Sequence, residues 1–133
     1  MAATPQITIV LTALESFTEN LIKKMALDVV ANLRKPGSQG GTPVDTGWAR
    51  ANWIAQIGSP VTKAVGSQEN VAAAEGATQA GLGSLLAYKL RAGSVFITNN
   101  VPYILKLNDE GSSSQAPKGF VQAAITAAVQ LNV

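Results

Sequence analysis

A long apolar repeat with helical spacing constrains the fold of this 133-residue chain more than any other feature. The repeat consists of large apolar residues at three- and four-residue steps: Leu14, Phe17, Leu21, Met25 and Val29. Such spacing places them all on one face of a helix. A capping box at Thr12 and Glu15 predicts where the helix starts, and Pro36-Gly37 predicts where it stops. We therefore expect a long N-terminal helix packed on a core, which is far commoner than a helix lying on a membrane surface.

The rest of the chain alternates between strand-like and helix-like stretches. Residues 7–11 are apolar and partly β-branched, so they fit either a short first strand or the opening turn of the long helix. The expected strands are residues 48–57, 61–65 and 94–98, and the expected further helices are residues 84–91, 101–110 and 118–131. Residues 61–83 form a Gly- and Ala-rich lobe that we expect to be flexible, with a partial helix over 68–74 as the alternative.

The sequence therefore predicts one α+β domain over residues 1–133. In this domain, the long N-terminal helix and two or three shorter helices pack on a small, mainly antiparallel sheet of three or four strands.

The composition excludes several kinds of site. The chain has no Cys and no His, so disulfides and thiolate metal sites are impossible and the commonest general base near neutral pH is missing. Only 14% of the residues are charged, against roughly 25% in an average soluble domain. We expect no cofactor, no metal and no catalytic residue, and a surface that is partly hidden against other subunits.

No apolar run reaches the length of a membrane span, and the first residues lack the pattern of a signal peptide. We therefore expect no membrane contact and a protein that stays in the cytoplasm where it is made.

Residues 45–47 (DTG) are the one motif with a catalytic parallel. Aspartic proteases use Asp-Thr-Gly, and two such carboxylates share a proton because like charges so close cannot both ionise. In those enzymes the motif follows an apolar strand, whereas Asp45 follows a Gly-rich loop. An ordinary turn is the more frequent explanation of so short a motif.

Two other pairs of residues are candidates for contacts rather than chemistry. Asp109 and Glu110 are neighbours on a helix end, where carboxylates oppose the helix dipole. They are either solvated or face a cation such as Arg50 or a Lys or Arg of another subunit. Trp48 and Trp53 stand five residues apart on an expected strand, so they should face opposite sides, one in the core and one at an interface.

Two segments resemble the neck, or tail-completion, proteins of long-tailed bacteriophages. Residues 42–53 (TPVDTGWARANW) resemble the family signature TPVDTG-x-x-R-x-x-W. Residues 97–103, 110–111 and 114–119 are similar to a second signature, ItNn-x-PYa…lE-x-G-x-S-x-QAP-x-G. The segments come in the family's order, and with the N-terminal helix the likeness covers nearly the whole chain. The chain departs from the pattern at residues 109–111, where the family usually has one residue between the acid and the Gly.

The resemblance implies a small α+β subunit that is not an enzyme and that assembles into a ring, with a hexamer favoured and a dodecamer as the alternative. Its implied place is the neck or tail of the virion, after assembly in the host cytoplasm. The implied neighbours are connector or stopper, tail terminator, tail tube or sheath proteins, and DNA passes through without sequence-specific contact. Folding and interface roles fall on Asp45, Arg50, Trp53, Tyr103, Glu110, Gln115 and Pro117. We expect the DTG turn at residues 45–47 and the SSSQAP loop at residues 112–117 to lie close together and to form or brace a subunit contact.

A nucleic-acid-binding module that lines a DNA channel is the alternative from a different class. The ten basic residues are scattered along the sequence and aromatic residues make up only 5%. Nucleic-acid binders usually gather basic residues into a stripe and interleave aromatic ones. This alternative predicts an affinity for DNA that falls steeply as salt is raised.

Overall fold

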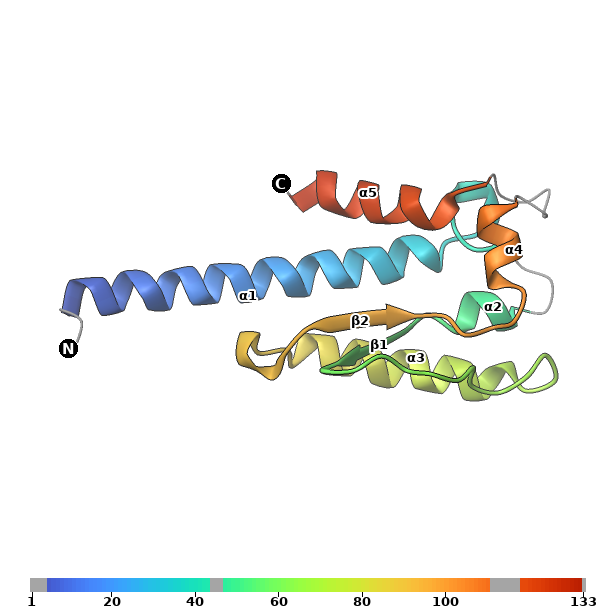
Figure 1. Cartoon of the computed structure of the whole chain (residues 1–133), viewed down its shortest axis with the longest axis horizontal. Helices are drawn as coiled ribbons and strands as arrows, with labels where there is room; N and C mark the ends of the chain where they lie inside the picture. The colour runs from blue at the N-terminus through green and yellow to red at the C-terminus, as the bar shows by residue number, and fades with distance from the viewer. Residues whose placement is uncertain (1–4, 44–46, 111–117, 133) are drawn as a thin grey trace.

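The computed structural model of the protein is built around one long helix, α1 (Pro5–Leu33) (Figure 1). The structure describes residues 5–43, 47–110 and 118–132, with side chains from residue 8 onward. The other elements, in chain order, are η1 (Gly37–Gln39), α2 (Trp48–Ala51), β1 (Ile54–Ile57), α3 (Val71–Leu86), η2 (Leu90–Ala92), β2 (Val95–Thr98), α4 (Ile104–Asp109) and α5 (Phe120–Asn132). Figure 1 shows α5 beside the C-terminal half of α1, the strands and α3 on its other side, and α2 and α4 gathered at one end.

The start and the end of α1 test two predictions. Residues 7–11 lie inside α1, so the helical alternative for this segment is correct and the strand is wrong. The capping box is wrong because the helix runs through both of its residues, and the Thr12 hydroxyl instead donates a 2.9 Å hydrogen bond to the Thr8 carbonyl. The predicted stop is correct. The Leu33 carbonyl accepts hydrogen bonds from the backbone N–H of Thr42 at 2.9 Å and from its hydroxyl at 2.7 Å, so the returning chain caps the helix end.

The apolar repeat of α1 is covered only in the C-terminal half of the helix. Leu21, Met25 and Val29 are half-buried, whereas Leu14 is 56% exposed and Phe17 is 67% exposed. The prediction that the whole stripe packs on a core is therefore wrong for its first half. The reason is length, because α1 has 29 residues and α5, which packs on it, has only 13.

The described sheet has two strands instead of the expected three or four. β1 and β2 are antiparallel, with Ile54 opposite Thr98 and Ile57 opposite Val95. Residues 48–57, predicted as one strand, begin as the short helix α2. The chain enters α2 through Gly47 at φ 90°, a left-handed conformation that glycine adopts without the steric penalty of a Cβ.

Residues 61–65, predicted as a strand, are held by a side chain instead of a neighbouring strand. The Val65 N–H donates to Asn52 Oδ1 at 2.9 Å, and the Val65 carbonyl accepts from Asn52 Nδ2 at 3.0 Å. One amide therefore satisfies both backbone groups that a ladder would otherwise use.

Helix α3 occupies most of the segment expected as a Gly- and Ala-rich lobe. Asn70 caps it by accepting a 3.3 Å hydrogen bond from the Ala73 N–H. Its Gly81 lies directly against β1, since a Cβ there would come within 2.8 Å of the Ala55 carbonyl oxygen. The helix predicted at 84–91 is only partly correct, because α3 ends at Leu86 and η2 follows as a separate turn.

The last third of the chain matches its predictions. The strand at 94–98 is β2, and the closing helix is α5. The helix predicted at 101–110 is α4, which begins only at Ile104, after the N-cap Tyr103. The α+β class with a long N-terminal helix is confirmed, with more helix and less sheet than the sequence predicted.

Candidate functional site

The described parts of the two phage-like segments meet in one hydrophobic cluster. Its buried members come from α1, from both segments, from α4 and from α5: Leu33, Ala49, Trp53, Val101, Ile104, Phe120 and Ala124. The cluster lies at the end of the molecule where α2 and α4 are gathered (Figure 1). The residues that carry the resemblance therefore build a common core rather than two separate surfaces.

The two tryptophans belong to this one cluster, which corrects the prediction that they face opposite sides of a strand. Trp53 is 6% exposed and donates its ring N–H to the Thr42 hydroxyl at 2.7 Å. Trp48 lies in α2, donates its ring N–H to the Val65 carbonyl at 2.8 Å and meets Tyr103 edge to face at 6.2 Å between ring centroids. Both rings thus hold the two segments together inside the subunit.

Four asparagines that the sequence analysis did not single out join the loops around this cluster. Asn52 holds the Val65 backbone, and Asn99 donates to the Ala49 carbonyl at 2.7 Å. Asn100 donates to the carbonyl of residue 61 at 2.9 Å. The available signal was the Asn-Asn pair directly after a strand, because asparagine side chains commonly bond to backbone in turns.

Asn108 joins the end of α4 to the start of α5 in a similar way. Its Oδ1 accepts from the Val121 N–H at 2.9 Å and its Nδ2 donates to Gln122 Oε1 at 3.0 Å. The Gly119 N–H donates to the Asn108 carbonyl at 2.7 Å. The side chain and the backbone carbonyl of Asn108 therefore both hold the start of α5 against the end of α4.

Arg50 makes an internal contact that the sequence did not predict. Its Nε donates to the Arg34 carbonyl at 2.5 Å, next to the ion pair between Arg34 and Glu75. Within the described residues, no ion pair joins Arg50 to Asp109 or Glu110. Arg50 therefore links α2 to the end of α1.

The remaining predicted site residues fall into two groups. Tyr103 precedes α4 as its N-cap and is half-buried, while Glu110 follows α4 as its C-cap and is exposed. Asp45, Gln115 and Pro117 lie outside the described residues. The hypothesis that the DTG turn and the SSSQAP loop lie close together and brace a subunit contact therefore stays a prediction.

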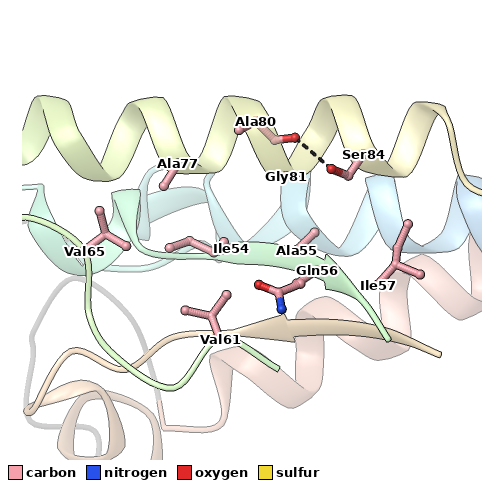
Figure 2. A pocket seen from close by; sticks show the side chains of 10 residues that line it. All are labelled: Ile54, Ala55, Gln56, Ile57, Val61, Val65, Ala77, Ala80, Gly81 and Ser84. Atoms are coloured by element: carbon pink, nitrogen blue, oxygen red, sulfur yellow. Dashed lines mark hydrogen bonds between the residues drawn. The ribbon is translucent and has the colours of Figure 1, made fainter. Parts of the chain in front are cut away.

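An open groove of about 460 Å³ lies between β1, α3 and residues 61–65 (Figure 2). Its lining is mainly apolar, and its two polar side chains already have partners. Ser84 donates to the Ala80 carbonyl at 3.2 Å, and Gln56 donates to the Ser59 hydroxyl at 2.9 Å. None of the residues that line the groove is ionisable, so it offers apolar contact rather than acid–base chemistry.

Two kinds of feature are absent from the described residues. No group of three or more Asp and Glu residues there could hold a metal ion. No helix among those same residues is both long and apolar enough to cross a membrane.

Two carboxylates of α1 fasten other elements to it. Glu19 accepts a 3.0 Å hydrogen bond from the Leu90 N–H, and this bond, with Lys89 nearby, holds the pKa of Glu19 below its ordinary value. Asp28 pairs with Lys24 at 2.6 Å and accepts from Asn132 at 2.8 Å, and both contacts lower the pKa of Asp28. Glu19 thereby ties η2 to α1, and Asp28 ties down the end of α5.

Lowered carboxyl pKa values predict that acid destabilises the fold. Their contribution is present above the ordinary carboxyl pKa of about 4 and is lost as the pH falls through the lower folded-state pKa. We expect the melting temperature to fall below about pH 4, and to fall less in the Asp28→Asn, Glu19→Gln double variant. Thermal unfolding followed by circular dichroism at several pH values measures this. Glu69→Gln, which changes an exposed carboxylate elsewhere, is the control, and equal pH profiles for wild type and double variant would contradict the assignment.

Large apolar side chains are exposed over several helices. They are Ile9, Val10, Leu11, Leu14 and Phe17 on α1, Leu86 on α3, Leu105 on α4, and Ile125, Val129 and Leu131 on α5. Every side chain from residue 8 to residue 18 is exposed. So much exposed apolar surface on one small chain usually marks an interaction site.

Comparison of the chain with family models, with curated proteins and with solved structures finds no match.

Proposed function

We propose that this chain is a structural subunit of the neck or tail-completion ring of a long-tailed bacteriophage. In this role it joins the head to the tail or finishes the tail end, in contact with connector, terminator, tube or sheath proteins. The family in this proposal comes from the resemblance of two segments to its signatures. The hydrogen bonds and packing of residues in these segments support a role for them in folding. The side chains of Trp53, Asn52 and Asn99 form hydrogen bonds with other parts of the same chain.

The observation that carries the proposal is the exposed apolar half of α1. Residues 8–18 include five large apolar side chains, each at least 51% exposed, and only one charged residue, Glu15. Keeping this surface in water is unfavourable, and burying it against other subunits removes the cost. A subunit made to assemble is therefore favoured over an isolated enzyme or a monomeric binding module.

The test of the proposal is the oligomeric state of the purified protein, alone and with a tail fraction. We expect native mass spectrometry and negative-stain images to show one closed ring, six times the 13.7 kDa subunit mass in the favoured case. A protein that stays monomeric at every concentration and binds no particle would refute the proposal.

Glu110 separates assembly from folding. Its side chain is exposed at the end of α4, so Glu110→Ala should change stability by less than about 0.5 kcal/mol. If Glu110 faces a cation of a neighbouring copy, the same variant should weaken ring formation at least about tenfold. Arg50→Ala should weaken both, since Arg50 also bonds within the subunit. If Glu110→Ala forms rings at the same concentrations as wild type, Glu110 is not part of the interface.

A further inference from the structure

The first surface in this inference is the exposed part of α1, residues 8–18, which we call the arm. Its exposed apolar side chains range from Leu11 at 51% to Ile9 at 68%. Its one charged residue, Glu15, faces Arg91 of the same chain at 3.7 Å. The arm therefore has an apolar surface with almost no charge to guide or repel a partner.

The second surface is a stripe on α5. Ile125 and Val129 are one helical turn apart, and they are 45% and 38% exposed. We call these two residues the outer stripe. The other side of α5, with Phe120, Ala124 and Ala128, is buried. No residue of α5 is charged, so the outer stripe is as poor in charge as the arm.

The arm continues the side of α1 that already binds α5 within the chain. Asp28 and Asn32 hydrogen-bond to α5 through Asn132 and the carbonyl of residue 124. At about 3.6 residues per turn, Val10, Leu14 and Phe17 lie on the same side of α1 as Asp28 and Asn32. The arm thus carries on the α1–α5 seam beyond the point where α5 ends.

We propose that the arm of one copy packs on the outer stripe of α5 of the next copy. This inference rests on the proposed ring and names the contact that closes it. Helix α5 is the kind of partner that α1 already accepts along this side. The arm lacks the basic residues that would bind nucleic acid or an anionic membrane, which favours a second copy over either of them.

The arm and helix α5 are similar in length. The arm is about 16 Å long and α5 about 20 Å, at roughly 1.5 Å per residue. The five exposed apolar side chains around the arm offer an area on the order of 500 Å² in total. Val10, Leu14 and Phe17 on the seam side supply part of this area, so the contact is a small one. Each copy has one arm and one outer stripe, so the contact joins two different patches, as a closed ring requires.

Charge substitutions on each surface test the contact. The arm variant is Leu14→Lys with Phe17→Lys, and the stripe variant is Ile125→Lys with Val129→Lys. All four side chains are exposed, so both variants should keep the wild-type circular dichroism spectrum. Their melting temperature should equal that of wild type at protein concentrations where wild type is not assembled, since assembly itself raises the melting temperature. Each variant alone should lose ring formation, with self-association weakened at least about 100-fold, because an unpaired ammonium would be buried in the contact. Leu105→Lys, at a residue 68% exposed on α4, is the matched control and should assemble like wild type.

Mixing the two variants gives the sharpest result. The stripe variant keeps a working arm and the arm variant keeps a working outer stripe, so an equimolar mixture should form a heterodimer and stop there. Native mass spectrometry distinguishes this dimer from rings and monomers by mass. A contact between two arms would instead leave the stripe variant fully assembled.

The possible failures are distinguishable. If wild type forms rings and the stripe variant does so equally well, the arm has another receptor and this inference is wrong while the proposed function stands. If wild type itself never assembles, alone or with a tail fraction, the proposed function fails with it. If the arm variant assembles like wild type, the arm is not part of the ring contact.

Discussion

Trp53→Ala is expected to lower the free energy of unfolding by about 3–5 kcal/mol, the usual cost of truncating a buried tryptophan. Trp53 is 6% exposed and lies in the cluster that joins α1, both phage-like segments and α5. A domain of this size is typically stable by only about 5–15 kcal/mol, so much of its stability would be lost. Urea unfolding followed by circular dichroism measures the change.

Two further variants show how much of this cost comes from the hydrogen bond to Thr42. Trp53→Phe removes the ring N–H, and Thr42→Val removes the hydroxyl that accepts it at 2.7 Å. Thr42→Val leaves the buried ring N–H of Trp53 without its acceptor and should cost about 1–3 kcal/mol. Trp53→Phe removes one hydrogen bond, worth about 0.5–1.5 kcal/mol, while the Thr42 hydroxyl still donates to the Leu33 carbonyl. The double variant should cost clearly less than the two single costs added. Additive costs would show that the two groups do not interact, and Leu105→Ala, at an exposed residue, should have almost no effect.

Gly81→Ala is expected to destabilise the protein by about 1–3 kcal/mol, although alanine is the better helix former. A Cβ at residue 81 would lie 2.8 Å from the carbonyl oxygen and 3.0 Å from the nitrogen of Ala55. These are backbone atoms of β1, which cannot rotate away, so α3 would have to move off the strand. The groove beside β1 in Figure 2 would then widen, since Gly81 and Ala55 both line it.

Two glycines in the same helix are matched controls. Gly76 and Gly83 lie in α3, and a Cβ at either would meet nothing within 4 Å. Gly76→Ala and Gly83→Ala should each stabilise the protein by roughly 0.5–1 kcal/mol, because alanine loses less backbone entropy on folding. If Gly81→Ala were as stabilising as these two, the close approach of α3 to β1 would be refuted. Denaturant unfolding of the three variants side by side decides the point.

Only some residues of the candidate site were predictable from the sequence, and their arrangement was not. Trp53 and Tyr103 were identified from the motifs, and both contribute to the cluster or border it. That Trp48 packs beside Tyr103 depends on α2 being a helix, which four residues of weak pattern cannot show. The roles of Asn52 and Asn99 depend on loops far away in sequence that lie beside them only in the folded chain.

Alone, the sequence determined the α+β class, the stop of α1 shortly before Pro36 and the places of β2, α4 and α5. These features depend on local periodicity and on turn residues, which act over a few neighbouring positions. Only the tertiary structure decided that the apolar repeat of α1 is half-buried at Val29 but exposed at Phe17. Burial depends on the element that lies opposite, and α5 is too short to cover the whole of α1. The same reason explains α3, whose small residues give a weak helical pattern but allow the close contact with β1 that holds the helix in place.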